Sequence, residues 1–472
     1  MIDLLEAAAA ADATQTAVIT PEAAPTYGEL LDDSRRVATA LRRRGVTRFA
    51  VAEPDAAWVL RLLAGAALVG AEPCQYQPDT DARTLAEEAG ALGHTTLVTR
   101  RADIGGGGGL EVIDPGALMD EEAGAADFGP ADRPQPLVIR TTGTTGAPKA
   151  ARHDWRVLTQ TVAKVQPAPE QRWLLAYGPQ QFAGIQVLLH VVASGATLIA
   201  PFPRQPKNGL DALLSDGVTC LSATPTFWRF LLAEARSRQV RLPSLDQITL
   251  GGEACPADLL DELRSTFPFA RVSQVYASTE FGSITSVTDG LPGMSIGALW
   301  SASNPNSNVR AENGELWVRA EAGMLGYADG TDGDGPSDDR DFDGAAPSAT
   351  AWRPTGDLVE IVGTRVLFRG RQSEIINVGG VKVHPLPVEE RILALPSVDA
   401  ARVFGRSSKL TGSIVAADIV PVGGVETADG DAIRRAVKEA TADLPRAWQP
   451  RSITLVAELE TRGGKTVRGT QA

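Results

Sequence analysis

The sequence predicts an α/β protein of at least two domains. Its 472 residues exceed the roughly 250–300 at which a single hydrophobic core stops growing. Between residues 26 and 276, short apolar runs alternate with segments of helical periodicity, which is typical of layered α/β domains. After a turn at 370–373, helices and strands alternate again, so a small α+β domain is expected from about Glu374 onward.

The elements of the large domain can be placed in order. Residues 26–46 have apolar side chains at helical spacing and end at Gly45, which predicts an amphipathic helix. A strand is expected at 48–52, followed by an Ala/Leu-rich helix over 56–69. Further strands are expected at 137–139, 173–177, 218–222, 248–250, 272–276, 358–362 and 366–368, with a helix and a strand between 182 and 198.

The small domain is expected to alternate in the same way. Helices are predicted from Pro387 and over 429–441, and strands near Ala400, near Ile414 and over 453–456. Between the two domains, residues 329–348 are rich in Asp, Gly, Ser and Pro, which predicts a mobile acidic loop. Five consecutive glycines, 105–109, predict a surface loop.

The stretch 139–149, with sequence IRTTGTTGAPK, has the chemistry of a phosphate-binding loop. Its glycines permit tight turns, its threonines supply hydroxyls and Lys149 supplies a cation. The preceding strand would deliver it to the edge of a sheet, where open α/β folds bind ligands. A polar surface turn is the alternative. The loop is not a Walker A motif, because Ala147 and Pro148 separate the lysine from Gly146.

Composition excludes several classes of protein. The formal net charge of −13 disfavours nucleic acid and anionic membranes as partners. An anionic substrate would need local cations, which Lys149, Arg140 and Arg152 could supply. Three scattered cysteines and four scattered histidines form neither a disulfide framework nor a metal motif.

The N-terminus lacks the features of a signal peptide or a membrane anchor. It carries Asp3 and Glu6 where a signal peptide needs cations, and no uncharged apolar run reaches about 18 residues. A soluble, cytoplasmic protein is therefore expected. No feature of the sequence selects an oligomeric state.

Five separated motifs occur in an order that resembles a known family. They are Thr142–Lys149, Tyr276–Glu280 (sequence YASTE), Thr355–Asp357 (TGD), Gly370–Arg371 and the closing pattern Thr461–Arg468. Together they are similar to the motifs of the adenylate-forming superfamily, which includes acyl-CoA synthetases, adenylation domains of peptide synthetases and luciferase. The resemblance runs from Thr26 to Arg468, nearly the whole chain.

The resemblance implies a fold and a reaction. A large N-terminal domain, 1–370, would contain α/β subdomains and a small β-barrel-like part. A hinge, 371–373, centred on Ser373, would connect it to a small mobile α+β lid domain, 374–472, that carries the catalytic lysine. The reaction would convert a carboxylic acid and ATP into an acyl-adenylate and pyrophosphate. The acyl group would then pass to the thiol of coenzyme A or of a carrier protein's phosphopantetheine.

The resemblance also implies residue roles in the first reaction. Lys465 would stabilise the charge of the transition state, Thr279 would donate to a phosphate oxygen, and Glu280 would hold Mg²⁺. Tyr276 would stack on adenine, and Asp357 would accept the ribose hydroxyls. The expected nucleotide-binding set is Thr141, Thr142, Gly143, Thr144, Thr145, Gly146, Lys149, Tyr276, Asp357 and Arg371.

The acid pocket implied by the resemblance has mostly small residues. Its expected lining is Phe182, Gly184, Ser222, Gly251, Gly252, Glu253, Ala277, Ser278 and Ile284. Such a lining suits a flat or short acid, for example a substituted benzoate or cinnamate. Glu253 would either recognise an amino or hydroxyl substituent or point outward into solvent.

Three departures from the family pattern leave the acceptor open. Ser373 replaces the usual Asp or Lys of the hinge, Ala277 replaces a glycine beside the acyl group, and Pro387 stands where Glu is common. Gly379 and Gly380 would either line a pantetheine path or form an ordinary hairpin turn. The alternatives are therefore an adenylating enzyme with an amine or nitrite as acceptor, and, in another class, a catalytically silent nucleotide-binding scaffold.

Overall fold

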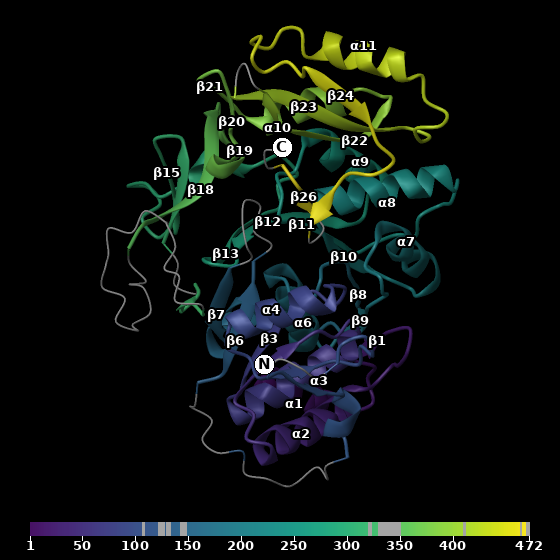
Figure 1. The fold of residues 1–472 in the computed structure, drawn as a ribbon, viewed down its shortest axis with the longest axis vertical. Coiled ribbons are helices and arrows are strands. Elements are labelled where there is room, and N and C mark those ends of the chain that lie inside the picture. Colours follow the sequence, from purple (N-terminus) through teal and green to yellow (C-terminus); the bar gives the residue numbers. More distant parts are fainter. Residues whose placement is uncertain are drawn as a thin grey trace.

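The computed structural model has a large N-terminal part and a small C-terminal domain that sits against one side of it (Figure 1). The structure describes residues 1–105, 109–120, 128, 134–141, 149–319, 323–328, 351–408, 412–462 and 465–468. The centre of the phosphate loop, 142–148, lies outside the described residues, as do the predicted acidic loop at 329–348 and glycines 106–108 of the predicted glycine loop. The fold class expected from the sequence is confirmed.

Seven strands form the first sheet, in the order β17-β7-β6-β3-β2-β4-β5. They are β2 (Arg48–Val51), β3 (Glu72–Gln75), β4 (Thr96–Val98), β5 (Glu111–Ile113), β6 (Pro136–Arg140), β7 (Ala150–Asp154) and β17 (Gly326–Tyr327). The strands from β6 to β5 are parallel, whereas β7 runs antiparallel to β6. The phosphate loop is therefore the connection between β6 and β7.

A second sheet of seven strands has the order β1-β9-β8-β10-β11-β12-β13. Its strands are β1 (Val18–Ile19), β8 (Arg172–Leu175), β9 (Thr197–Ile199), β10 (Cys220–Ala223), β11 (Gln247–Gly251), β12 (Arg271–Ser278) and β13 (Gly282–Val287). All neighbours are parallel except β12 and β13. The carboxyl ends of β10, β11 and β12 consequently meet at one edge, where parallel sheets usually bind ligands.

The part expected to resemble a barrel is an antiparallel sheet of five strands in the order β14-β19-β18-β16-β15. The strands are β14 (Met294–Ser295), β15 (Val309–Glu312), β16 (Glu315–Val318), β18 (Arg353–Val362) and β19 (Arg365–Arg371). The register of β18 and β19 places Asp357 directly opposite Arg371. Two motif residues that are distant in sequence thus become neighbours.

The C-terminal domain forms its own core around a small sheet. Its elements are β20 (Ile376–Val378), β21 (Val381–Val383), α10 (Pro385–Leu393), β22 (Val398–Ser408), β23 (Gly412–Pro421), α11 (Gly430–Ala440), β24 (Ser452–Leu455), β25 (Thr461–Arg462) and β26 (Lys465–Thr466). Gly379 and Gly380 form the turn between β20 and β21, with φ of +58° and +88°. These angles require glycine in a two-residue hairpin.

The helices of the large part pack against the two seven-stranded sheets (Figure 1). They are α1 (Ile2–Ala11), α2 (Tyr27–Arg43), α3 (Ala56–Val69), α4 (Ala82–Ala91), α5 (Trp155–Leu158), α6 (Phe182–Ser194), α7 (Pro206–Ser215), α8 (Pro225–Ser237) and α9 (Ala257–Thr266), with short 3₁₀ turns at Pro115–Leu118, Thr159–Val162, Ile296–Ala298 and Gln372–Glu374. Within the described ranges, no helix combines the length and apolar character needed to cross a bilayer.

Helix α2 shows how local sequence sets an element boundary. The hydroxyl of Thr26 accepts a hydrogen bond from the main-chain N–H of Glu29, whose carboxylate accepts from the N–H of Thr26. This capping box satisfies two donors that the first turn would otherwise leave unpaired. The helix ends before Gly45, whose φ of +66° is accessible to glycine without strain.

Tyr27 connects this helix to α6. Its side chain is buried, and its hydroxyl lies 2.7 Å from the carbonyl oxygen of Ala196 and 3.1 Å from that of Val191. Burial raises the pKa of Tyr27 well above its usual value, so the phenol remains a hydrogen-bond donor.

We expect Tyr27→Phe to lower the free energy of unfolding by about 1–2 kcal/mol, because a buried carbonyl oxygen loses its donor. Urea unfolding followed by circular dichroism measures this change. An unchanged free energy of unfolding for Tyr27→Phe would show that water replaces the lost hydrogen bond.

Candidate functional site

The predicted motifs meet in one cavity of about 900 Å³ between the ends of β11 and β12, the strand β19 and the C-terminal domain. This volume is at the upper end of the roughly 300–1,000 Å³ typical of ligand pockets. The described residues of the predicted site that line it are Thr141, Lys149, Gly252, Glu253, Tyr276, Ala277, Ser278, Thr279, Glu280, Asp357, Arg371, Ser373 and Lys465. The cavity is therefore large enough for a nucleotide together with a small second ligand.

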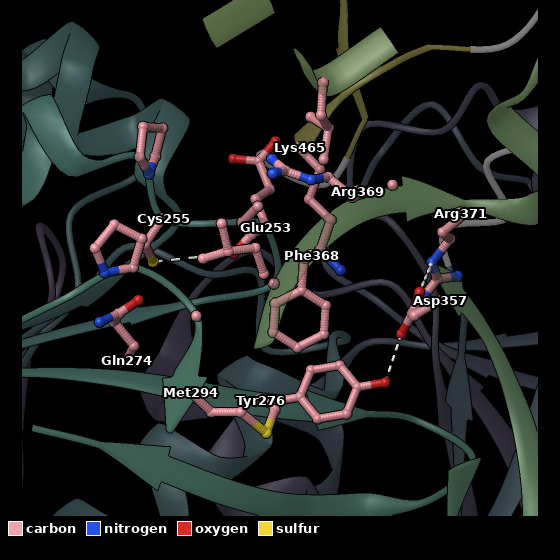
Figure 2. Close-up of a pocket in the computed structure, with 18 of the residues that line it drawn as sticks. Glu253, Cys255, Gln274, Tyr276, Met294, Asp357, Phe368, Arg369, Arg371 and Lys465 are labelled. Carbon is pink, nitrogen blue, oxygen red and sulfur yellow. Dashed lines mark hydrogen bonds and ion pairs between the residues drawn. The ribbon is translucent and has the colours of Figure 1, made fainter. Parts of the chain in front are cut away.

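One side of the cavity is built around the carboxylate of Asp357. The hydroxyl of Tyr276 donates to Oδ2 at 2.5 Å, and Nε of Arg371 lies 3.1 Å from Oδ1 (Figure 2). Burial, then the nearby Asp357 charge, holds the pKa of Tyr276 well above its usual value, so the phenol stays protonated. Asp357 raises the pKa of Arg371. The three side chains form a fixed polar edge with a charged donor and spare carboxylate lone pairs.

The ring of Tyr276 also packs against Phe368. The ring centroids are 4.9 Å apart and the planes are inclined by 31°. Phe368 lies on β19 and lines the cavity, so it holds the tyrosine ring from one side (Figure 2). An aromatic ring supported in this way is a suitable platform for a flat heterocycle.

Lys465 reaches the cavity from the hairpin of β25 and β26 in the C-terminal domain. Its aliphatic chain passes over Gly252, where an added Cβ would lie 2.8 Å from Cε and 3.4 Å from Nζ of the lysine. Burial, followed by the positive charge of Arg371, lowers the pKa of Lys465. Glu253, Asp357 and Glu280 act in the opposite direction and support the charged form.

The two ends of the phosphate loop are joined at its base. The N–H of Thr141 donates to the carbonyl oxygen of Lys149 at 2.7 Å, and the N–H of Lys149 lies 3.2 Å from the Thr141 hydroxyl. The ammonium of Lys149 lies 5.1 Å from the centroid of the Tyr327 ring. The predicted ligands Thr142, Gly143, Thr144, Thr145 and Gly146 lie outside the described residues.

The expected supporting cations do not reach this cavity. Arg140 pairs with Glu88 at 2.7 Å, and Arg152 pairs with Glu72 at 2.5 Å. Neither lines the cavity. The prediction that these two arginines supply charge to an anionic ligand was wrong, because Glu88 on α4 and Glu72 on β3 already pair with them.

Thr279 and Glu280 lie at the turn between β12 and β13 and line the cavity. The hydroxyl of Ser278 accepts from the N–H of Phe281 at 3.1 Å, which fixes this turn. Within the described ranges, no group of three His, Cys, Asp or Glu side chains could hold a metal ion. A single carboxylate is nevertheless a suitable ligand for Mg²⁺ that is bound mainly through substrate phosphates.

Five residues of the predicted acid pocket do not line the cavity. They are Phe182, Gly184, Ser222, Gly251 and Ile284. Gly184 lies so close to the chain that a Cβ would be 2.1 Å from the carbonyl oxygen of Gly178. Ile284 packs on the core of the five-stranded sheet.

Gly251 and Phe182 both lie against buried side chains of the large part of the chain. The Tyr177 hydroxyl lies 3.3 Å from the carbonyl oxygen of Gly251, and the Tyr177 side chain is buried. Phe182 is buried as well and packs beside His153, with ring centroids 5.9 Å apart. Burial lowers the pKa of His153 to about 4, so the imidazole is neutral.

Glu253 differs from both expectations stated for it. Its carboxylate neither faces solvent nor stands free for a substrate substituent, because its side chain is only 7% exposed and accepts two main-chain hydrogen bonds. The N–H of Thr226 lies 3.1 Å from Oε2, and the N–H of Thr466 lies 3.0 Å from Oε1. Sequence spacing gave no indication of these contacts, since 213 residues separate Glu253 from Thr466.

Other cavity residues were not predicted from the sequence. They include Cys255, Gln274, Met294, Phe368 and Arg369 (Figure 2). Gln274 could have been found, because it precedes Tyr276 by two residues and side chains at that spacing share one face of a strand. Its amide donates to the carbonyl oxygen of Leu291 at 2.7 Å. Burial raises the pKa of the free thiol of Cys255 to about 12.

Comparison with protein families gives two matches that together span most of the chain. The family described as AMP-binding enzyme matches residues 5–328, and the family described as AMP-binding enzyme C-terminal domain matches residues 387–465. The first match includes the end of β12 and the phosphate loop, and the second ends at Lys465. The second begins 13 residues after Glu374, where the small domain was expected to begin.

Individual relatives and structures agree with these matches. A feruloyl-CoA synthase from Amycolatopsis sp. is 27% identical, with 96% of this chain and 94% of the relative aligned. An isonitrile lipopeptide synthase from Streptomyces coeruleorubidus is 26% identical over 95% of this chain, which spans only 31% of that protein. The crystal structure of an anthranilate CoA ligase with anthranoyl-AMP superposes with a TM-score of 0.80 at 20% identity, covering 99% of this chain and 95% of that one.

The close approach of Gly252 to Lys465 generates a prediction. In Gly252→Ala the new methyl group would displace the lysine, and the φ of +83° would be strained by any side chain. We expect the reaction that depends on Lys465 to slow at least about tenfold, since an ångström-scale misplacement has effects of this size. Steady-state kinetics of pyrophosphate release measure it.

Gly90→Ala is a matched control, because that glycine lies on α4 with no atom within 4 Å of the added Cβ. It should leave the rate unchanged and slightly raise the melting temperature. A Gly252→Ala protein with unaltered kinetics would contradict the placement of Lys465 against this glycine.

Proposed function

The chain belongs to the AMP-binding enzymes, the adenylate-forming superfamily that its motifs resemble, and on this basis we propose that it activates a small carboxylic acid as an acyl-adenylate. ATP is the second substrate and pyrophosphate is the first product. The chain is an AMP-forming acid ligase.

A single observation carries this proposal. Lys465, from the far end of the chain, reaches the same cavity as Tyr276, Asp357 and Arg371. A buried ammonium is costly unless an anion accompanies it in the functional state. The triphosphate of ATP would supply that anion, so the cavity fits a nucleotide better than it fits a neutral ligand.

In the first half-reaction an oxygen of the acid attacks the α-phosphorus of ATP. A new C–O–P linkage forms, the bond to the β-phosphate breaks, and pyrophosphate leaves with the bonding electron pair. Two anions must approach each other, and negative charge accumulates on the oxygens of the α-phosphate. Lys465 would stabilise that charge where it develops. Tyr276 and Asp357 would hold the adenine and the ribose, which orients the α-phosphorus for attack.

Mg²⁺ would be bound by Glu280 and the phosphate oxygens, and when bound it would offset part of the phosphate charge. The rest of the phosphate contacts would come from Lys149, Thr141 and the threonines between them. Thr279 would donate its hydroxyl to a phosphate oxygen. These roles are the ones that the resemblance implies, and their support is that Thr141, Lys149, Thr279 and Glu280 line the cavity.

The acid is proposed to be small and aromatic. Ala277 and Ser278 provide small surfaces at the end of β12, and Ala277 packs against the core cluster that contains Tyr177 and Phe182. Such small surfaces suit a flat or short acid better than a long alkyl chain. Feruloyl-CoA synthase and anthranilate CoA ligase, two proteins similar to this chain, carry aromatic acids in their names.

The acceptor is proposed to be a thiol, either of coenzyme A or of a carrier protein. Its sulfur would attack the acyl carbon, a C–S bond would form, and AMP would leave as the C–O bond breaks. Rotation of the small domain about Ser373 would withdraw Lys465 and admit the thiol. Ser373 lies in the short 3₁₀ turn between β19 and β20, which connects the two domains.

The function is tested by pyrophosphate release with ATP, Mg²⁺ and a panel of aromatic, amino and short aliphatic acids, each with and without coenzyme A. We expect release that depends on a small aromatic acid, and a thioester when coenzyme A is present. Lys465→Ala should reduce release by roughly 10²-fold or more, in line with removal of a single transition-state donor.

Release that ignores coenzyme A would point to a carrier protein, an amine or nitrite as acceptor. No release with any acid, including in the presence of nitrite, would contradict the proposed function and favour a silent nucleotide-binding scaffold. Isothermal titration with ATP then decides whether the nucleotide binds at all.

The lowered pKa of Lys465 predicts a pH dependence. Transition-state stabilisation requires the ammonium, so kcat/KM for pyrophosphate release should fall as pH rises through a pKa below the usual lysine value of 10.5. The corresponding fall of kcat with rising pH should lie at higher pH than the fall of kcat/KM, because bound phosphates favour the protonated lysine. In Lys465→Arg this fall should disappear, since arginine stays charged. An identical fall in Lys465→Arg would assign it to another group.

A further inference from the structure

Glu253 makes a contact across the domain boundary that the proposed reaction does not by itself require. It follows Gly251 and Gly252 at the end of β11, in the large part of the chain. One carboxylate oxygen accepts from the N–H of Thr226 at 3.1 Å, and the other from the N–H of Thr466 at 3.0 Å. Thr226 lies in the first turn of α8, whereas Thr466 belongs to the C-terminal domain. We call this arrangement the carboxylate bridge.

The bridge is anchored firmly on the side of the large domain. The first-turn N–H groups of a helix have no partner within the helix, and the helix dipole favours a negative charge there. Helix α8 is 13 residues long, and its N-cap Thr224 accepts from the N–H of Phe227. Glu253 satisfies a different donor of the same turn. It therefore keeps its position whether or not the small domain is docked.

On the other side, the bridge is continuous with the core of the small domain. The hydroxyls of Thr226 and Thr466 are 3.1 Å apart. Two residues further along the chain, Nη1 of Arg468 lies 4.0 Å from Glu253. Nε of Arg468 donates to Glu389 at 2.8 Å, and the same Glu389 oxygen accepts from the N–H of Val403 on β22. Residues 466–468 are thereby held between both domains.

The position of the bridge matters because Thr466 directly follows Lys465. Fixing the main-chain N–H of Thr466 fixes the backbone from which the lysine side chain extends. The side chain then has a single narrow path over Gly252, which immediately precedes Glu253. Glu253 thus positions the lysine through a hydrogen bond to the adjacent residue, and Gly252 leaves room for the lysine because it has no side chain.

We propose that Glu253 is a positioning residue whose carboxylate holds the small domain in the arrangement that brings Lys465 to the nucleotide cavity. This inference rests on the proposed function for its catalytic consequence. When the domain moves away, the charge-assisted hydrogen bond between Glu253 and the main-chain N–H of Thr466 is lost. The bridge therefore shifts the equilibrium toward the docked arrangement.

The first test traps that arrangement without any substrate. Cysteines replace Thr226 and Thr466, whose side-chain oxygens are within about 1 Å of the length of a disulfide bond, in a Cys255→Ser background. Disulfide formation with oxidised glutathione is followed by gel mobility. We expect ready cross-linking with Glu253 present and about tenfold slower cross-linking with Glu253→Gln. The glutamine side chain has one acceptor oxygen, so its N–H₂ group would face one of the two main-chain N–H donors.

Glu29→Gln is the matched control. Glu29 also accepts from a main-chain N–H, at 2.8 Å, but in the capping box of α2, far from the domain boundary. It should leave the cross-linking rate unchanged. Equal rates for the Glu253→Gln protein and its parent would overturn the proposal, and so would absence of cross-linking in the parent.

The second test separates the half-reactions. Glu253→Gln should slow pyrophosphate release about tenfold, whereas thioester formation from added acyl-adenylate should be as fast as before. Glu253→Asp, which keeps the charge but shortens the reach, should behave in the same direction. An equal loss in both half-reactions, or a lowered melting temperature that accounts for the loss, would make Glu253 a merely structural residue.

The two tests fail independently. If no acid supports pyrophosphate release, the proposed function fails while the cross-linking rates still report on Glu253. If release occurs but Glu253→Gln leaves both cross-linking and release unaltered, the inference fails while the proposed function stands.

Discussion

The ammonium group of Lys465 must be brought into a cavity that lies between two domains, and the organisation of the site depends on this constraint. Burial opposes the charge and lowers the pKa of the lysine, while Glu253, Asp357 and Glu280 favour the charge. Removing a charged group from water costs several kcal/mol unless other charges compensate. The carboxylates around the cavity therefore contribute a local field that favours the protonated lysine.

The scaffold satisfies this constraint by bringing the ends of many strands together. Parallel neighbours β10, β11 and β12 end at the same edge, so Gly252 and Tyr276 stand side by side although they are distant in sequence. The register of β18 and β19 adds Asp357 and Arg371 from another sheet. The small domain contributes Lys465 and Thr466 from one short hairpin, and Leu386 and Glu390 from α10. In such a site the side chains on strands have fixed positions, whereas the side chain on the hairpin can move with the small domain.

Much of the fold was predictable because its signals are local. The helix at 56–69 was predicted with the bounds observed for α3, and the helix at 26–46 agrees with α2 and its capping box. The cavity residues Tyr276, Asp357 and Lys465 were predicted from motifs. Four of the nine residues predicted for the acid pocket line the cavity, and the role of the other five stays a prediction. Small and aromatic residues occur both in cores and in ligand pockets, so residue type alone could not distinguish these two locations.

The sequence by itself determined the α/β class, the order of the elements, the motifs and thereby the family. These properties follow from periodicity, glycine and proline positions, and short patterns whose spacing is set along the chain. Only the tertiary structure decided the partners of Glu253, the pairing of Arg140 and Arg152 away from the cavity, and the passage of Lys465 over Gly252. Each is a contact between side chains or backbone groups that are distant along the chain, and its geometry depends on how sheets and domains pack, which no local pattern encodes.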